Sequence, residues 1–433
     1  MSQIYLFVLS AIVVLILGHV AIKPARIFEY PYFMAATFAV FVLPQGYSLV
    51  RFPGSLGPDE VADILLMSIL CLVSAVLGYS VRPTRVAKRM FDQPLDLERL
   101  YLTGVGLICV GFISSYLLAA DEEIQAVGNQ GTGRITLYFF FGSLALPGFC
   151  ICVRLLWERF TTGRLLWVMI GALLPLSAIL FSGRRETAVS FGMAIVLTRF
   201  FQNRKSPARA LIFGSIFFAM VAIPAIGTYR GLMATGRGDL VKEIRLVDNF
   251  KDFFNKESIL ELRNGAAVMH ATNFTGNFGW GRGYWNQLVF RFVPAQIVGR
   301  DIKDSLMIGT DSRRILEAQL ENKFEISSGS TITGMGDSYR EFGWLGCLFF
   351  AIVGRFFRAL WNSCVNHDAI FPQIFYIMIC TSAMRALTHQ SVDFLPGMIH
   401  QFIFLGMGYA YAKIPIRDVR LRTQMRAPAA RRR

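Results

Sequence analysis

Residues 61–80 read VADILLMSILCLVSAVLGYS, a run of twenty positions with one charged side chain, Asp63. An α-helix of this length rises about 30 Å, which matches the hydrocarbon thickness of a bilayer. Because a helix satisfies its backbone hydrogen bonds internally, it is the default conformation of such a segment in lipid. The run therefore predicts a membrane-spanning helix.

Comparable apolar runs recur along the whole chain. The 433 residues are 54% hydrophobic and 17% charged, with a mean hydropathy of +0.46, which excludes an ordinary soluble enzyme. We predict an all-α polytopic membrane protein with eleven spans, at residues 3–22, 32–50, 61–80, 100–120, 135–157, 165–181, 187–201, 210–227, 342–361, 370–387 and 396–412. The first run has no small-residue cleavage site and no strongly basic leader, so we expect it to be retained as a helix.

The connections between these spans differ in their content of Lys and Arg. One alternating set holds 24 basic residues, and its richest part is the tail that ends in Arg431, Arg432 and Arg433. Leaving out the long segment 229–338, the opposite set holds only Arg51, Arg134, Arg184, Arg185 and Arg385. Because an excess of basic residues marks the cytoplasmic side, we predict a cytoplasmic carboxyl terminus, with the amino terminus and the long segment outside. The same asymmetry accounts for the net charge of +15 without nucleic acid.

The predicted organisation is a membrane domain interrupted once. Residues 1–228 carry eight helices, residues 229–338 form a large extracytoplasmic loop domain, residues 339–413 carry three more helices, and residues 414–433 are a basic tail. Within the loop, apolar spacing predicts helices at 259–271 and 312–323. The glycine-rich and aromatic segment between them, 273–300, predicts irregular chain.

No cofactor or metal signature is present in the sequence. The seven cysteines lie outside the loop domain, and Cys150 and Cys152 have no second Cys or His pair at ligand spacing, so we interpret them as packing residues. There is no Walker loop, dinucleotide fingerprint or zinc motif, which disfavours an ATP-driven pump. We predict no cofactor and no bound metal.

Candidate functional residues begin at the turn Phe181-Ser182-Gly183-Arg184-Arg185-Glu186, which joins two spans on the predicted outer side. Its two arginines oppose the general charge bias. A guanidinium binds phosphate oxygens bidentately and stays charged when partly desolvated, so we predict a lipid diphosphate as partner. The alternative is that Arg184 or Arg185 pairs with Glu186 or reaches lipid headgroups.

Three further cations fall on the predicted outer side, namely Arg230, Arg340 and Arg385. Each alone could anchor a helix at the interface, but together they favour an anionic site. Arg385, His389 and Asp393 are four residues apart and would share one face if the helix continued. A His beside an Asp accepts protons near neutral pH, whereas an ordinary hydrogen bond to the His is the alternative.

The candidates for proton transfer are Glu186, His389 and Asp337, and Asp337 and Glu341 could instead be salt-bridge partners of Arg340. The aromatic residues Trp280, Tyr284 and Trp285 suit saccharide recognition, and structural packing or contact with the membrane surface is their alternative. Arg263 and His270 lie one heptad apart on the predicted loop helix and are further saccharide-binding candidates. We interpret His400, inside the last span, as a packing or interhelix hydrogen-bonding residue.

Three segments resemble the Wzy-type oligosaccharide repeat-unit polymerases of bacterial O-antigen, capsule and exopolysaccharide assembly. They are Ser182-Gly183-Arg184-Arg185, then Phe292-Val293-Pro294 through Asp301-Ile302-Lys303, and Ser330-Thr331-Ile332-Thr333-Gly334 through Tyr339-Arg340-Glu341-Phe342-Gly343-Trp344-Leu345-Gly346. Many spans with one large, late outer loop are also typical of that family. The pattern of an Arg followed by ten residues and a Gly, found in some members' outer loops, is absent here.

The resemblance implies a GT-C-like architecture in the bacterial inner membrane and a glycosyltransferase that polymerises undecaprenyl-diphosphate-linked oligosaccharides at the periplasmic face. A chain-length regulator and a flippase are the partners it suggests. Two other functions stay open at this point. One is an O-antigen ligase, which joins a finished glycan once, and the other is a non-enzymatic transporter or flippase of lipid-linked saccharides. The scarcity of charge at span centres disfavours the transporter.

Overall fold

The computed structural model describes residues 1–81, 94–121, 134–234, 245–255, 260–309, 331–365 and 369–414. These residues are mainly helical, and an isolated bridge joins Leu95 to Lys413. The helices of the amino-terminal half are α1 (Ser2–Ile22), η1 (Pro24–Phe28), α2 (Tyr30–Thr37), η2 (Phe38–Val42), α3 (Leu43–Arg51), α4 (Pro58–Ser80), α6 (Leu97–Ala120), α8 (Arg134–Gly142), α9 (Ala145–Glu158), α10 (Thr162–Ser182), α11 (Arg185–Asn203) and α12 (Arg209–Ala234).

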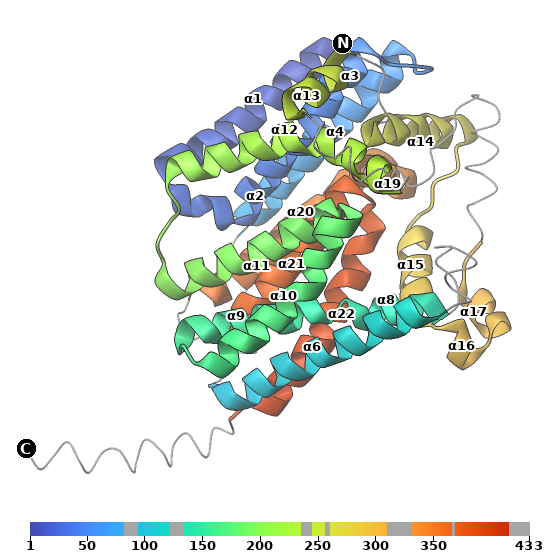
Figure 1. Cartoon of the computed structure of the whole chain (residues 1–433). Coiled ribbons are helices and arrows are strands. Elements are labelled where there is room, and N and C mark those ends of the chain that lie inside the picture. The colour runs from blue at the N-terminus through green and yellow to red at the C-terminus, as the bar shows by residue number, and fades with distance from the viewer. Residues whose placement is uncertain are drawn as a thin grey trace, which may run out of the picture.

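The remaining helices follow in two groups. The loop domain contributes α13 (Leu246–Asn255), α14 (Glu261–Thr275), α15 (Arg282–Phe292), α16 (Ala295–Val298) and α17 (Arg300–Leu306). The chain then re-enters the bundle as α19 (Thr333–Phe342), η4 (Gly343–Gly346), α20 (Cys347–Cys364), α21 (Ile370–Thr388), η5 (Ser391–Asp393) and α22 (Phe394–Ala412). Figure 1 shows the long helices side by side, with α14, α15, α16 and α17 along one edge of the bundle.

The structure confirms an all-helical membrane protein. In the described part of the chain, eight helical segments are long and apolar enough to cross a bilayer, and they coincide with eight of the predicted spans. They are Ser2–Ile22, Tyr30–Arg51, Pro58–Ser80, Leu97–Ala120, Arg134–Glu158, Thr162–Phe181, Thr333–Cys364 and Ile370–Thr388. The other three predicted spans also fold as helices, α11, α12 and α22, but are less apolar or have a shorter apolar part, so their crossing stays a prediction.

Local sequence signals explain where several helices begin and end. The Asp96 carboxylate accepts hydrogen bonds from the backbone N–H groups of Glu98 and Arg99 and so caps the start of α6. Thr161 caps α10 in the same way. Gly183 ends α10 with a left-handed backbone at φ +56°, a conformation that costs glycine little. This ending produces the short turn that presents Arg184 and Arg185.

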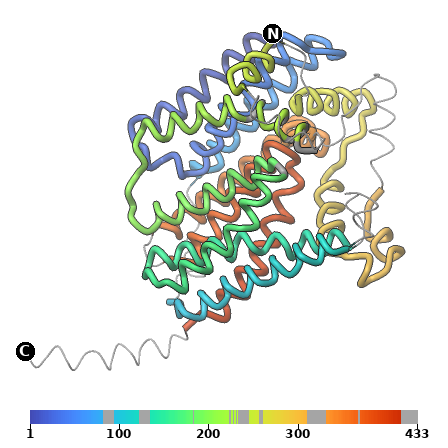
Figure 2. Tube along the Cα trace, in the orientation of Figure 1, coloured from blue at the N-terminus to red at the C-terminus, as the bar shows by residue number. Residues whose placement is uncertain are grey.

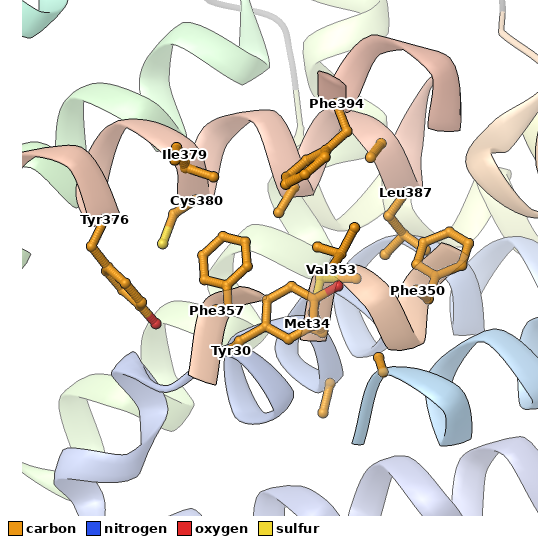
Figure 3. Close-up of a cluster of buried hydrophobic side chains, with 14 of the residues drawn as sticks. Tyr30, Met34, Phe350, Val353, Phe357, Tyr376, Ile379, Cys380, Leu387 and Phe394 are labelled. Carbon is orange, nitrogen blue, oxygen red and sulfur yellow. The ribbon is translucent and has the colours of Figure 1, made fainter. Parts of the chain in front are cut away.

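The bundle core brings the amino-terminal helix α4 against the carboxyl-terminal helix α20, and Figure 2 shows the blue and orange segments of the chain next to each other. Glycines allow α4 and α20 to approach closely, because a Cβ on Gly78 would lie 2.0 Å from the Ala351 carbonyl oxygen. Figure 3 shows the neighbouring aromatic cluster, in which the rings of Tyr30 and Phe357 stack at 4.5 Å and the Tyr376 hydroxyl donates to the Phe28 carbonyl at 2.6 Å. These contacts hold η1, α2, α20 and α21 together in the core.

The loop domain is more regular than the sequence indicated. The predicted helix at 259–271 is confirmed by α14, but the prediction of irregular chain at 273–300 is wrong, because α15, α16 and α17 occupy most of it. The helix predicted at 312–323 lies outside the described residues. The short helix α19 packs between α14 and α21. Two glycines permit this close approach, because a Cβ on Gly334 would lie 1.7 Å from the Ala386 carbonyl oxygen and a Cβ on Gly336 would lie 2.6 Å from the Gly265 Cα.

Candidate active site at one end of the bundle

The turn between α10 and α11 sends its two arginines in different directions. Arg184 is exposed, and its guanidinium carbon lies 5.9 Å from the ring centroid of Phe139 on α8. Arg185 Nη2 lies 3.7 Å from Glu261 Oε1 at the start of α14. Neither arginine is the salt-bridge partner of Glu186, so that alternative is not what the structure shows. The partner of Glu186 is Arg385, with Nε and Oε1 3.5 Å apart.

Arg385 is the centre of this group. Besides Glu186, it contacts Asp393, with 3.4 Å between Nη2 and Oδ2. Gln287 of α15 donates from Nε2 to the other oxygen of Asp393 at 2.7 Å. One guanidinium thus connects α11, α21 and η5, and η5 is tied to α15. All four elements meet at the end of the bundle that was predicted to be the outer side.

The predicted face of Arg385, His389 and Asp393 is wrong in its geometry. The helix α21 ends at Thr388, and His389 has φ −115° and ψ −85°, so the three residues do not share one helical face. Arg385 and Asp393 nevertheless meet, because the chain turns back through η5. His389 Nδ1 lies 2.9 Å from Thr388 Oγ1, so the ordinary hydrogen bond is the alternative that holds.

Arg291 joins the group although the sequence analysis missed it. Its guanidinium carbon lies 5.9 Å from the ring centroid of Phe140, the neighbour of Phe139 on α8. It lies close enough to Glu186 for its charge to favour the ionised carboxylate, as Arg184 does. Within the described part of the chain, neither Arg184 nor Arg291 forms a salt bridge with a carboxylate. The sequence analysis missed Arg291 because it predicted irregular chain at 273–300, where the structure has the helix α15.

The environment changes the proton affinity of two candidate bases that lie beyond the ends of the predicted spans. Burial raises the pKa of Glu186 above its usual value, and this outweighs the opposing effect of Arg385. Burial, reinforced by the positive charges of Arg385 and Arg185, lowers the pKa of His389 to about 4. His389 is therefore neutral at pH 7, and Glu186 binds a proton more readily than an exposed glutamate does.

A second polar cluster is centred on Asp337 of α19, which is fully buried. Its Oδ1 accepts from Arg340 Nη2 at 2.8 Å, and its Oδ2 accepts from Ser391 Oγ at 2.7 Å and from the Val392 N–H at 3.0 Å. Because Ser391 has one hydroxyl proton and gives it to Asp337, the 2.8 Å contact with Tyr284 requires the tyrosine to donate. Asp337 thereby fixes η5, which carries Asp393, against α19 and α15.

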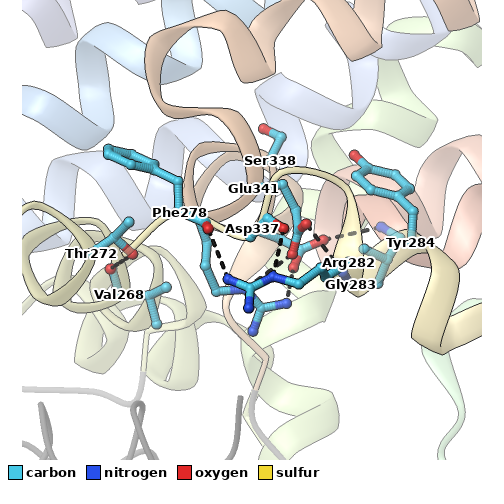
Figure 4. Close-up of polar contacts among 12 residues, drawn as sticks. Val268, Thr272, Phe278, Arg282, Gly283, Tyr284, Asp337, Ser338 and Glu341 are labelled. Carbon is cyan, nitrogen blue, oxygen red and sulfur yellow. Dashed lines mark hydrogen bonds and ion pairs between the residues drawn. The ribbon is translucent and has the colours of Figure 1, made fainter. Parts of the chain in front are cut away.

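Glu341, also fully buried, fixes the start of α15. Its Oε2 accepts from the N–H groups of Gly281 and Gly283 at 3.0 and 3.1 Å (Figure 4). Arg340 Nε lies 3.8 Å from the other carboxylate oxygen. Asp337 and Glu341 are therefore salt-bridge partners of Arg340, which was one of the two interpretations left open. Arg340 belongs to this buried cluster rather than to the group around Arg385.

The five predicted saccharide-binding residues do not gather at one surface. Arg263 is buried and donates to the Phe52 carbonyl at 2.6 Å. His270 Nδ1 lies 3.1 Å from Glu60 Oε1 on α4. Both side chains thus hold α14 on the amino-terminal helices.

The three aromatic candidates, on or beside α15, differ in exposure. The Tyr284 hydroxyl belongs to the Asp337 cluster, and Trp285 donates to the Leu306 carbonyl at 2.8 Å. Trp280 is 69% exposed. Of the five candidates, Trp280 is the one that the structure leaves most accessible to a ligand.

Some predicted features cannot be placed. The side chain of Arg230 lies outside the described residues, as does the basic tail from residue 415 onward. His400 is buried, and its Nε2 lies 3.1 Å from the Phe140 carbonyl oxygen, which confirms it as a packing and interhelix hydrogen-bonding residue. Among the described residues, no three His, Cys, Asp or Glu side chains gather in a way that could hold a metal ion.

Comparison with known proteins gives no independent indication of function. No family model matches the chain, and no solved structure matches it. The functional inference therefore depends on the residues and geometry described above.

Proposed function

We propose that this protein is a glycosyltransferase that polymerises undecaprenyl-diphosphate-linked oligosaccharide repeat units at the periplasmic face of a bacterial inner membrane. The observation that carries the proposal is the pair Arg184 and Arg291. They come from separate elements, lie over neighbouring rings on α8 and form no salt bridge in the described structure, although the charges of Glu186 and Asp393 act on Arg291. The eleven-span count and the GT-C-like architecture implied by the resemblance are part of the same proposal.

An anionic ligand is the natural partner for these two groups. Burial of Arg291, beside the charge of Arg385, lowers its pKa, so the cation is held at an energetic cost. A phosphate would offset that cost, because its oxygens accept paired hydrogen bonds from the planar guanidinium. The aromatic rings beneath Arg184 and Arg291 add cation–π attraction without neutralising either charge. A diphosphate would span the two guanidinium groups.

In the proposed reaction, a hydroxyl oxygen of the lipid-linked repeat unit attacks the anomeric carbon of the growing glycan. The bond between that carbon and the diphosphate oxygen breaks, and the undecaprenyl diphosphate departs with the electron pair. Arg184, Arg291 and Arg385 would stabilise the negative charge that develops on the leaving group. The hydroxyl proton passes to the carboxylate of Glu186, which is one-third exposed and adjoins all three arginines.

The other predicted residues act around this centre. Both oxygens of Asp337 are occupied by protein donors, so we assign it to positioning η5 and not to proton transfer. Arg340 is neutralised by Asp337 and Glu341 and belongs to the same support. Arg185 pairs with Glu261 and holds α14 against the start of α11. Neutral His389, on which the charges of Arg185 and Arg385 both act, can accept a hydrogen bond from a substrate hydroxyl.

The test is an assay with purified protein and lipid-linked repeat units extracted from the source bacterium, with products separated on a gel. We expect a ladder of chains, and Arg184→Ala and Arg291→Ala should each slow elongation about 100-fold, as loss of one charge-stabilising donor does. Arg99→Ala is the control, since Arg99 is exposed, pairs with Asp96 and lies at the predicted cytoplasmic end.

Each other outcome is informative. Normal elongation by both arginine variants would remove the site from the proposal. Single transfer of a glycan onto lipid A core, without a ladder, would favour a ligase. Movement of the lipid-linked saccharide across a liposome membrane without any elongation would favour a transporter.

A further inference from the structure

Trp280 has an unusual backbone for its size. Its φ is +51°, in the left-handed region that bulky side chains rarely adopt, and its side chain is 69% exposed. Burial therefore does not explain why a tryptophan occupies this position. Strained residues of this kind persist when the surrounding structure holds them, and they concentrate at binding sites.

The turn around Trp280 is held by backbone groups, by the Glu341 carboxylate and by the Arg282 guanidinium, and not by the indole. The N–H of Gly279 donates to the Arg340 carbonyl at 2.9 Å, and the N–H of Trp280 donates to the Glu341 carbonyl at 2.8 Å. The Glu341 carboxylate accepts from the N–H groups of Gly281 and Gly283. A glycine at position 280 would keep all of these bonds and would adopt the positive φ without strain. The indole is thus dispensable for the turn.

The contacts of the indole are few, and its surroundings are polar. Its described ring contact is with Phe278, at 6.0 Å between centroids. Arg282, two residues along the chain, donates from Nε to the Gly279 carbonyl and from Nη2 to the Phe278 carbonyl. The buried Glu341 carboxylate contacts the turn at Gly283 (Figure 4), and Arg340 lies 3.8 Å from that carboxylate. An exposed aromatic face beside polar groups suits a ligand with both apolar and hydroxylated surfaces, and contact with the membrane surface is the alternative.

The turn is also placed relative to the arginine group. The helix α15 begins directly after it, and from Arg282 to Arg291 the helix rises roughly 14 Å at 1.5 Å per residue. A ligand with its diphosphate at Arg291 would therefore reach Trp280 only through a saccharide several units long. Oligosaccharide repeat units have such a length.

We propose that Trp280 is a stacking platform for a pyranose ring of the oligosaccharide, at a subsite distant from the diphosphate. The apolar face of the sugar packs on the indole, and Arg282 lies beside its hydroxyl groups. This inference rests on the proposed function for the identity of its ligand, but it concerns saccharide binding and not bond formation. Its failure can therefore be separated from a failure of the polymerase assignment.

The test compares three variants with a matched control. Trp280→Gly, Trp280→Ala and Trp280→Phe are prepared as full-length protein in detergent, and Phe274→Gly is the control because Phe274 is 67% exposed on regular helix α14. The probe is the repeat-unit oligosaccharide released from its lipid by mild acid, and its dissociation constant is measured by calorimetry. Thermal unfolding midpoints are measured on the same samples.

We expect Trp280→Gly and Trp280→Ala to weaken oligosaccharide binding about tenfold, as loss of one aromatic contact does, while Trp280→Phe stays within about threefold. Trp280→Gly should raise the unfolding midpoint by relieving the positive φ, whereas Phe274→Gly should lower it. If Arg184→Ala abolishes elongation while the Trp280 variants bind normally, the proposed function stands and this inference falls.

Two further outcomes would overturn the inference. One is unchanged binding of the oligosaccharide by Trp280→Gly and Trp280→Ala. The other is a midpoint for Trp280→Gly that falls as far as that of Phe274→Gly, because the indole would then have a structural role. Quenching of tryptophan fluorescence by brominated lipids that Trp280→Phe removes, and that the oligosaccharide leaves unchanged, would identify Trp280 as a membrane anchor in place of a sugar platform.

Discussion

Replacing Asp337 by Asn tests whether this buried carboxylate organises the site. The substitution keeps the shape of the side chain but turns one acceptor oxygen into an NH2 donor. Asp337 Oδ1 faces the Arg340 guanidinium, and Oδ2 faces the Ser391 hydroxyl and the Val392 N–H. Whichever way the amide turns, its NH2 group therefore meets donors that the carboxylate had satisfied.

The expected cost follows from these contacts. Breaking a buried ion pair typically costs about 3–5 kcal/mol. The lower end applies here because Arg340 is 16% exposed and keeps Glu341 at 3.8 Å. A loss of about 3 kcal/mol is roughly a 150-fold decrease in the folded-to-unfolded ratio. Ser391→Ala should cost about 1–2 kcal/mol, because it removes one hydrogen bond to the carboxylate and leaves the Tyr284 hydroxyl without its acceptor.

The assay is equilibrium unfolding in mixed micelles, followed by circular dichroism and extrapolated to zero denaturant. Asp304→Asn is the control, since Asp304 is exposed, and it should change the free energy of unfolding by less than about 0.5 kcal/mol. The double variant Asp337→Asn with Ser391→Ala should cost less than the sum of the single variants, because the two residues share a bond. A cost for Asp337→Asn equal to that of Asp304→Asn would refute the reasoning, as would full additivity.

Two more predictions concern packing and pH. Gly78→Ala should lower the free energy of unfolding by about 1–3 kcal/mol, because its Cβ would meet the Ala351 carbonyl. Gly106→Ala in α6 is the matched control, because the space around Gly106 is open. In the same unfolding assay it should be neutral or stabilising by up to about 1 kcal/mol. Elongation should lose activity on acidification at a pH above the usual carboxyl value of 4.5, because Glu186 must be ionised to accept a proton and burial raises its pKa. Arg291→Gln should raise the pH at which half of the elongation activity is lost, since it removes a positive charge that favours the ionised Glu186 carboxylate. An unchanged pH profile in this variant, or loss of activity only below pH 4.5 in the unmodified protein, would contradict Glu186 as the base.

The sequence was most informative where the deciding forces are local. Apolar runs of sufficient length predicted the spans because burial of apolar surface and backbone hydrogen bonding act within one segment. The helix at 259–271 was visible in its apolar spacing, and the turn at Gly183 was visible because glycine permits the left-handed ending of α10. These features need no knowledge of a distant partner.

Distant contacts decided the features that the sequence analysis missed. The spacing of Arg385, His389 and Asp393 suggested a continuing helix, but Asp337 binds Ser391 and Val392 and so stabilises the chain where it leaves the helix after Thr388. The sequence analysis did not predict the start of α15, because glycines such as Gly281 and Gly283 usually indicate irregular chain. In the structure their N–H groups donate to Glu341 of α19, and this contact fixes the start of the helix. Since the phase of α15 depends on that start, Arg291 could not be placed beside Glu186 from the sequence.

The value of a basic residue as a functional signal depends on its partner. Arg340 and Arg184 were both predicted from the sequence as phosphate ligands, since both fall on the predicted outer side. In the structure, Arg340 is held by the buried carboxylates of Asp337 and Glu341, whereas Arg184 lies over an aromatic ring with no carboxylate partner among the described residues. A guanidinium already neutralised by the protein has little to gain from a phosphate, and one that is not has much to gain. The candidate phosphate ligands are therefore Arg184 and Arg291, which form no salt bridge in the described structure, and Arg385 holds the carboxylates of Glu186 and Asp393 in the same group.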